Sequence, residues 1–260
     1  MILFPNAKIN VGLHIKRKRS DGFHELETIF YPVNFCDLLE IIIADELTLT
    51  TSGIDIPGDD NLCLQAYHML KQDYDIPAVN IHLHKIIPIG AGLGGGSSDA
   101  AFTLKGLNDI FDLQLSNKEL RKYAVKIGAD CPFFIENKPM LATGIGDILE
   151  PIGLDLSNYH IAIVNPNIHI SSSEAYSGVT PKKPLCSLSD LIKSPVNEWQ
   201  LKNDFEQSVF IKHSSIESLK NSLYEKGAVY AAMSGSGSSV FGLFENRPIL
   251  NYAESSFFLV

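Results

Sequence analysis

Residues 88–101 read Pro88-Ile89-Gly90-Ala91-Gly92-Leu93-Gly94-Gly95-Gly96-Ser97-Ser98-Asp99-Ala100-Ala101. Glycine adds no side chain to a core and costs backbone entropy, so this stretch indicates that a bare backbone is needed. The usual ligand of such a backbone is a phosphate chain, held by several N–H groups where a loop runs into the N-terminus of a helix. We expect Ser98 or Asp99 to cap that helix.

The sequence of residues 88–101 fits a Walker A loop, a dinucleotide-binding loop or a flexible linker less well. A Walker A loop ends in Gly-Lys-Ser or Gly-Lys-Thr, but the first lysine after the glycines is Lys105, inside the predicted helix. Gly90, Gly92 and Gly95 satisfy the G-x-G-x-x-G dinucleotide pattern. The preceding strand over 79–85 alternates apolar and polar residues, however, which is typical of an antiparallel strand with one solvated face. A flexible linker is disfavoured because the stretch lies between a strand and an amphipathic helix.

Composition limits the class of protein. The chain has 260 residues, of which 45% are hydrophobic and 20% charged, as in ordinary globular proteins with one large domain or two modest ones. The formal net charge of −9 argues against nucleic-acid binding, and no apolar run approaches the roughly 20 residues of a membrane-spanning helix. The four cysteines lack Cys-x-x-Cys spacing, so neither zinc nor a disulfide framework is indicated. No signal peptide is recognised, and we expect a cytoplasmic protein whose oligomeric state is open.

Two polar positions outside the glycine stretch are candidates for function. Lys8 and Asn10 share one face of a predicted strand over 6–15, and that polar face suits either a solvated edge or the floor of a site. Asp130 follows a helix stop at Gly128 and precedes an apolar segment that we interpret as a strand. It is either an ordinary turn residue or a functional carboxylate.

The rest of the chain offers two more loops and a domain junction. The segment Asp21-Gly22-Phe23-His24 either closes a hairpin or presents an aromatic ring and a histidine to a ligand. The second Gly/Ser loop, residues 234–239, is too long for a tight hairpin turn and is either a further source of N–H donors or a flexible hairpin tip. We place the junction near Pro151, which predicts domains over 1–150 and 151–260.

Together these motifs resemble those of the GHMP small-molecule kinases, nearly from end to end. Residues 5–10 are similar to the family's N-terminal motif, 88–101 to its ATP-binding motif and 234–239 to its third, glycine-rich motif. Residues 21–24 and 128–132 resemble segments of the branch whose substrate is a cytidine diphosphate derivative. The resemblance implies an α+β chain of two-layer α/β architecture, with a ribosomal S5 domain 2-like, ATP-binding N-terminal domain and a ferredoxin-like C-terminal domain.

The resemblance also implies a reaction. ATP, with Mg²⁺, donates its γ-phosphoryl group to the 2-hydroxyl of a small-molecule cytidine diphosphate derivative in the non-mevalonate route to isoprenoid precursors. Asp130 is the implied general base and Lys8 its partner, which fits the need for a proton acceptor and for positive charge beside the transferring oxygens. Ser98 is the implied neighbour of the metal. The implied phosphate contacts are Pro88, Ile89, Gly90, Ala91, Gly92, Leu93, Gly94, Gly95, Gly96, Ser97 and Ser98.

For the acceptor, the resemblance assigns cytosine recognition to His24, with Phe23 and Tyr176 as the aromatic neighbours of the base. Ser172 is implied as a polar contact of the substrate. Asn10, on the same strand face as Lys8, is expected to bind and orient the substrate or, alternatively, to orient Asp130. Position 23 is phenylalanine where the family usually has tyrosine, so the stacking contact is kept and a hydroxyl hydrogen bond is lost.

Two other hypotheses stay open. A homoserine or mevalonate kinase of the same family would have no base to recognise, which the segment 21–24 disfavours. A non-catalytic nucleotide-binding protein, or an RNA-binding module on the S5-like fold, would not need both Lys8 and Asp130. The acidic net charge further disfavours RNA.

Overall fold

The structure is a computed structural model that describes residues 1–58, 60–250 and 256–259. The chain divides into two compact units, each discontinuous in sequence, because the long strands β2 (Asn6–Lys18) and β3 (His24–Cys36) pass from one to the other. The predicted division at 150 and 151 stays a prediction. Unit 1 consists of Met1–Ala7, Asn34–Ile89 and Gly94–Lys138, and unit 2 of Lys8–Val33, Gly90–Leu93 and Pro139–Val260.

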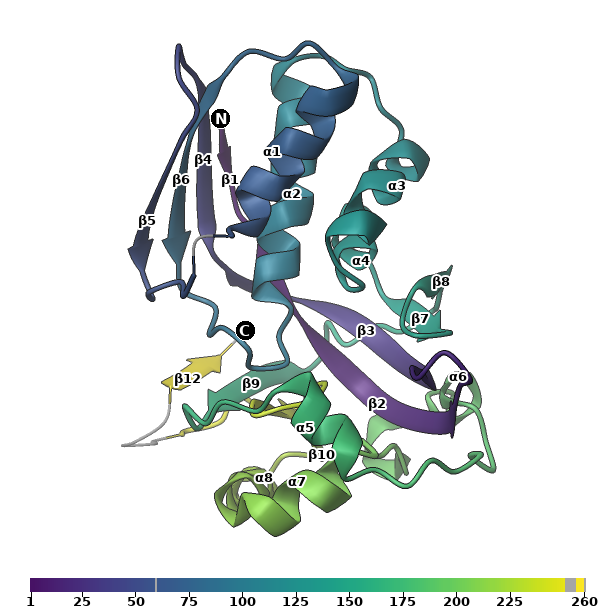
Figure 1. Cartoon of the computed structure of the whole chain (residues 1–260). Coiled ribbons are helices and arrows are strands. Elements are labelled where there is room, and N and C mark those ends of the chain that lie inside the picture. Colours follow the sequence, from purple (N-terminus) through teal and green to yellow (C-terminus); the bar gives the residue numbers. More distant parts are fainter. Residues whose placement is uncertain (59, 251–255, 260) are drawn as a thin grey trace. The chain divides into compact units, whose positions relative to one another are not determined.

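Unit 1 is a four-stranded sheet with helices over one face (Figure 1). The strand order is β1-β4-β6-β5, in which β5 pairs with β6 in parallel and the other neighbours are antiparallel. The alternation predicted for 79–85 is confirmed in β6, where Val79, Ile81 and Leu83 are buried. The elements are β1 (Ile2–Leu3), β4 (Leu38–Ile43), β5 (Thr48–Gly53), α1 (Leu62–Asp73), β6 (Val79–Lys85), α2 (Gly95–Ile110), α3 (Asn117–Ile127) and α4 (Cys131–Glu136).

Two predictions of local structure in unit 1 are wrong. Helix α2 begins at Gly95 with Gly94 as its N-cap at φ = 71°, so the predicted caps Ser98 and Asp99 lie inside the helix. Glycine enters the left-handed region without steric cost, and the backbone therefore turns into the helix before either capping side chain is reached. The segment after Asp130 forms helix α4 instead of a strand, because Pro132 suits a first helical turn.

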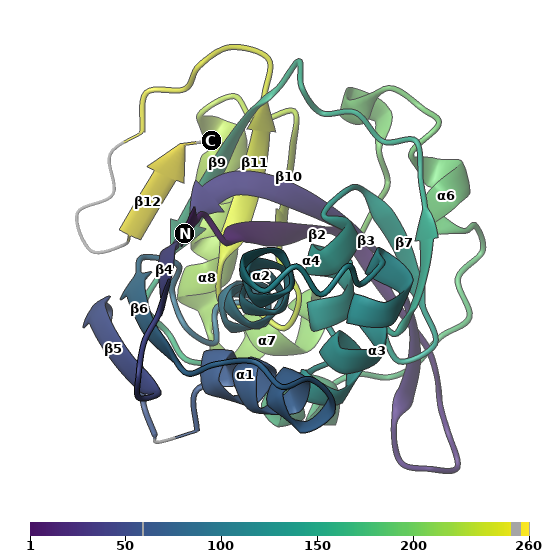
Figure 2. The same ribbon diagram turned by 90° about the horizontal axis from the view of Figure 1, so that it is seen from above.

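Unit 2 contains two antiparallel sheets, with strand orders β2-β3-β7-β8 and β10-β11-β9-β12. Figure 2 shows β9, β11 and β10 lying side by side in the second sheet. The further elements are β7 (Met140–Thr143), β8 (Ile148–Pro151), β9 (His160–Asn165), α5 (Ser172–Ser177), α6 (Leu188–Leu191), η1 (Val196–Glu198), α7 (Glu206–Lys212), α8 (Ser214–Glu225), β10 (Tyr230–Met233), β11 (Val240–Phe244) and β12 (Ser256–Leu259).

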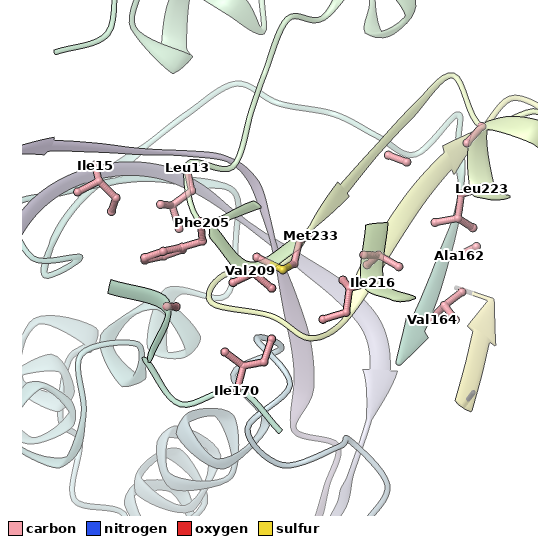
Figure 3. Packing of buried hydrophobic residues seen from close by; sticks show 14 of the residues in the cluster. Leu13, Ile15, Ala162, Val164, Ile170, Phe205, Val209, Ile216, Leu223 and Met233 are labelled. Atoms are coloured by element: carbon pink, nitrogen blue, oxygen red, sulfur yellow. The ribbon is translucent and has the colours of Figure 1, made fainter. Parts of the chain in front are cut away.

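The core of unit 2 joins the second sheet to α7, α8 and part of β2 (Figure 3). Leu13 and Ile15 reach it from β2, as the apolar face of that predicted strand requires. Burial of such apolar surface stabilises a fold by roughly 25 cal/mol per Å². The polar face of β2 is buried as well, since Lys8 is 3% and Asn10 2% exposed. The solvated-edge alternative is therefore wrong, and this face needs internal partners.

Three observations on the described residues concern cysteines, membrane-spanning helices and metal clusters. All four cysteines are free, with Cys63 and Cys131 buried. In the part of the chain that the structure describes, no helix has the length and apolarity to cross a membrane. Within the same residues no cluster of three or more histidine, cysteine or acidic side chains is arranged to hold a metal ion.

Candidate active site

The carbonyl groups of the glycine loop are held within unit 2. The oxygens of residues 91–93 all accept hydrogen bonds, and they therefore point away from any ligand that the loop binds. The donors are the Ser239 N–H to Ala91 (3.2 Å), the Lys8 Nζ and Ser234 Oγ to Gly92 (3.0 and 2.8 Å) and the Lys8 N–H to Leu93 (2.9 Å).

The N–H groups of the same loop, unlike its carbonyl groups, are not hydrogen-bonded to other described residues. From Ala91 to Ser97 they donate to no partner among the described residues. The N–H groups of Gly95, Gly96 and Ser97 belong to the first turn of α2, where no intrahelical acceptor exists. Unpaired donors together with the positive end of a helix of 16 residues suit a phosphate group.

Two positions of the loop require glycine because atoms of neighbouring residues lie too close for a Cβ. At Gly92, where φ is +77°, a Cβ would lie 1.9 Å from the Ser234 carbonyl oxygen. At Gly95 it would lie 2.8 Å from Lys85 Nζ and 2.9 Å from Ile87 Cγ2. The glycine composition therefore reflects packing behind the loop as well as access for a ligand in front of it.

Lys8 is fixed by a buried polar network in unit 2. Its Nζ donates to Asn10 Oδ1 (2.5 Å) and lies 5.0 Å from the centroid of the Phe30 ring. Asn10 Nδ2 donates to Thr28 Oγ1 (2.9 Å), which in turn donates to the Gly12 carbonyl (2.6 Å). The predicted substrate contact Asn10 thus has lysine and threonine as its partners, and the network determines where the ammonium group lies.

The second Gly/Ser loop, residues 234–239, is buried and hydrogen-bonded, so the hairpin-tip alternative is wrong. Ser234 Oγ accepts from the Asn10 N–H (3.2 Å) and donates to the Gly92 carbonyl. Asn203 Nδ2 donates to the carbonyls of Met233 and Gly235, both at 2.8 Å. Ser234 consequently connects this loop, the glycine loop and the lysine-bearing strand.

Asp130 lies in unit 1 beside the start of α2. It is the half-buried N-cap residue of α4, and the next residue, Cys131, interacts with the Ser97 side chain in the first turn of α2. Burial raises the pKa of the Cys131 thiol to about 11, an effect that the Ser97 hydrogen bond reduces. Asp130 therefore directly precedes a residue that contacts the first turn of α2, whereas its predicted partner Lys8 belongs to unit 2. The pairing of the two stays a prediction.

Buried charges lie behind the glycine loop in unit 1. Lys85 forms ion pairs with Asp37 and, at 3.0 Å, with Asp99 Oδ2, and all three side chains are buried. Asp37 also accepts from the N–H groups of Ile86 and Ile87. Burial raises the pKa of Asp99 to about 7, with Lys85 opposing and Asp37 reinforcing that rise.

Replacing Asp99 by asparagine should remove a pH dependence of stability. In the unfolded chain this carboxyl titrates near 3.8 and in the native state near 7, so folding takes up a proton between these values. The free energy of unfolding contributed by Asp99 therefore falls as the pH rises from about 4 to about 7. Urea unfolding gives the free energy of unfolding of Asp99→Asn and of the natural chain at pH 5 and at pH 8. The difference between the two proteins should shift in favour of Asp99→Asn at pH 8. Asp109→Asn, an exposed change on the same helix, is the control; a pH-independent difference for Asp99→Asn would contradict the assignment.

The predicted substrate residues lie in unit 2. His24, at the start of β3, stacks on Tyr176 of α5, with ring centroids 4.9 Å apart and an interplanar angle of 18°. Phe23, the residue before His24 at the β2–β3 turn, is 59% exposed. Ser172 is the exposed first residue of α5, whose N-cap is Ser171. The structure thus brings His24 and Tyr176 together and leaves the Phe23 ring accessible.

Three contributors to the site are not predicted by the sequence: Ser234, Thr28 and the Lys85 ion-pair cluster. The second Gly/Ser loop is visible in the sequence, but which of its serines reaches Gly92 depends on tertiary contacts. Lys85 has a signal in the sequence, since it occupies a buried register of the alternating strand together with Ile81 and Leu83. A lysine in an apolar register needs a buried carboxylate.

Comparison with known proteins identifies the family. The GHMP kinases N terminal domain matches residues 61–138, and the GHMP kinases C terminal domain matches residues 189–251. A 4-diphosphocytidyl-2-C-methyl-D-erythritol kinase from Parabacteroides distasonis is 53% identical, over 99% of this chain and 96% of its own. A crystal structure of 4-(cytidine 5'-diphospho)-2C-methyl-D-erythritol kinase has a TM-score of 0.81 at 31% identity, over 94% of this chain and 90% of that chain. The Methanococcus jannaschii mevalonate kinase has a TM-score of 0.69 at 14% identity, over 100% and 97%, which shows the fold alone.

The fold and the glycine loop define a GHMP kinase, with its N- and C-terminal domains. Within that class the chain belongs to the family of 4-diphosphocytidyl-2-C-methyl-D-erythritol kinases. The resemblance indicated by the motifs of the sequence is thereby confirmed, and so is the predicted α+β kinase fold.

Proposed function

We propose that this protein transfers the γ-phosphoryl group of ATP to the 2-hydroxyl of 4-diphosphocytidyl-2-C-methyl-D-erythritol, in the cytoplasm. The observation that carries the proposal is the glycine loop. Its N–H groups from Ala91 to Ser97 have no partner among the described residues, while its carbonyls are held by Lys8, Ser234 and Ser239. The family membership supplies the acceptor.

Asp130 is proposed as the general base and Lys8 as its partner. The base must take the proton of the attacking hydroxyl, and Asp130 sits next to the first turn of α2, where the phosphates bind. Lys8 would supply positive charge to the transferring oxygens, and Asn10 and Gly92 hold its ammonium group in one position. In this account Asn10 positions the lysine and does not itself need to touch the substrate.

Mg²⁺ is proposed as the metal cofactor. Ser98 Oγ and Asp99 Oδ1 are buried near the start of α2, and neither has a hydrogen-bond partner in the part of the chain that the structure describes. Hydroxyl and carboxylate oxygens are the ligands that this cation prefers. When bound, it neutralises charge on the β- and γ-phosphoryl oxygens. Ser98 is the residue that would hold it, since Asp99 is already paired with Lys85.

His24, Phe23 and Tyr176 are proposed to hold the cytosine base. Hydrogen bonds from the imidazole to the base edge would select cytosine, because a site built to hydrogen-bond rejects ligands that lack the matching group. The exposed Phe23 ring offers stacking area for the base. Ser172, exposed at the start of α5, is proposed as a further polar contact.

Thermal stability in the presence of ligands tests this assignment of the acceptor. Cytidine diphosphate should raise the melting temperature of the protein, because a ligand that binds only the native state stabilises it by mass action. Mevalonate and homoserine at the same concentration should leave it unchanged, and His24→Ala should abolish the effect of the nucleotide. A melting temperature that rises with mevalonate but not with cytidine diphosphate would assign the chain to another GHMP kinase.

A further inference from the structure

The outer face of the unit 1 sheet carries two histidines on one strand. Figure 1 shows α1 and α2 over the opposite face of this sheet. His82 and His84 are two residues apart in β6, so their side chains project to the same side. Both are half-buried, and their neighbours on the edge strand β5 are the exposed residues Thr50 and Ser52.

The two imidazole rings converge on one oxygen atom. His82 Nε2 lies 3.0 Å from Ser52 Oγ, and His84 Nδ1 lies 2.9 Å from the same oxygen. A serine hydroxyl has one proton and can donate to only one of these nitrogens. The other nitrogen must therefore donate its own proton to the serine oxygen or face that oxygen with a lone pair that receives no hydrogen bond.

A third contact orients the first ring. His82 Nδ1 lies 2.8 Å from Thr50 Oγ1. When Nδ1 carries the proton and donates to that hydroxyl, Nε2 is left as a lone-pair donor toward Ser52 Oγ, the oxygen that His84 Nδ1 also contacts. Metal-binding histidines are usually held in this way, with the remote N–H donated to a polar neighbour that fixes both tautomer and ring orientation.

We propose that His82 Nε2 and His84 Nδ1 chelate a divalent transition-metal ion such as Zn²⁺ on this face. Neutral imidazole nitrogens suit zinc, nickel and copper, and water would complete the coordination, because no third histidine, cysteine or acidic ligand is in place among the described residues. Glu40, the cross-strand neighbour of His82 in β4, adds negative charge on the same face. This site is separate from the phosphate loop and does not depend on the proposed reaction.

Metal binding would have a structural consequence. Strand β5 is the edge of the sheet, and its Ser52 lies between the two histidines of β6. An ion held by the two histidines would have to displace the Ser52 hydroxyl from between them. It would stabilise the fold to the extent that it binds the native chain more tightly than the unfolded one.

Zinc titration of the metal-stripped full chain tests the proposal. Calorimetry should show one Zn²⁺ bound per chain, and His82→Asn and His84→Asn should each weaken that binding by at least about tenfold. His68→Asn is the matched control, because His68 is an exposed histidine of the same unit on α1 and lies outside the His82–His84 pair. Thr50→Val should weaken binding by about 10–100-fold, because it removes the group that orients the His82 ring.

A second measurement keeps the test valid if a variant is less stable. Imidazole nitrogen NMR resonances of the natural chain should shift on adding zinc at His82 Nε2 and His84 Nδ1, with His68 unaffected. Absence of binding in the natural chain, or an affinity unchanged in both His82→Asn and His84→Asn, would overturn the proposal. Equal loss in His68→Asn would also overturn it, since binding would then come from scattered surface histidines.

Discussion

Asp130→Asn should lower kcat by about 10²–10⁴ while leaving ATP binding nearly intact. Asparagine keeps the shape of the N-cap residue of α4 but cannot accept the proton of the attacking hydroxyl. The backbone hydrogen bond at this position does not involve the carboxylate, since the Asp130 carbonyl accepts from the Phe133 N–H at 3.2 Å. Steady-state kinetics and a fluorescent-nucleotide titration separate the two effects.

Asp109→Asn is the control for this change. It removes a carboxylate from exposed surface on α2 and should leave both kcat and nucleotide affinity unaltered. Unchanged turnover in Asp130→Asn would remove this residue from the mechanism. A matching loss of ATP affinity would instead assign it to nucleotide binding.

Gly92→Ala should damage both stability and nucleotide binding. The added methyl group would lie 1.9 Å from the Ser234 carbonyl oxygen, so one of the two loops must move. The hydrogen bonds that Lys8 and Ser234 donate to the Gly92 carbonyl would then be lost or lengthened. We expect the KM for ATP to rise at least about tenfold, and the free energy of unfolding to fall by more than the roughly 1–2 kcal/mol of left-handed backbone strain.

Gly227→Ala is the control variant, because it measures the strain of a left-handed backbone without a steric clash. Gly227 also has a positive φ, +94°, but a Cβ there would have no atom within 4 Å. Its ATP kinetics should be those of the natural chain. Ser234→Ala is a milder test of the same contact if Gly92→Ala does not fold, and it should raise the KM for ATP in the same direction. Identical effects of Gly92→Ala and Gly227→Ala would contradict the role given to the loop contact.

Much of the site can be predicted because its chemistry is local in the sequence. A run of glycines before a helix indicates a phosphate site wherever the loop folds, and the apolar positions of β2 fix which of its faces is core. The predicted helix start is wrong because glycine at position 94 adopts a left-handed conformation that needs no capping side chain. The strand predicted after Asp130 is wrong because an apolar run of a few residues has no period that separates helix from strand.

Contacts between residues far apart in the chain cannot be predicted from the local sequence around either residue. Asn10 and Ser234 are 224 residues apart, yet the Asn10 N–H donates to the Ser234 hydroxyl. Lys85 and Asp37 form a buried ion pair across 48 residues. Each of these pairs depends on which elements the fold places together. The sequence therefore predicts the site as separate pieces, and the structure supplies the contacts of Lys8 with the glycine loop.

The central claim is that the chain is a kinase for a cytidine diphosphate derivative, and an ADP-release assay tests it most directly. ATP and Mg²⁺ would be supplied with 4-diphosphocytidyl-2-C-methyl-D-erythritol, homoserine or mevalonate as the acceptor. We expect ADP release with the first acceptor, and a kcat/KM for the other two that is lower by about 10⁴ or more, because they lack the base. Comparable turnover of homoserine or mevalonate, or no turnover of the cytidine derivative, would contradict the account.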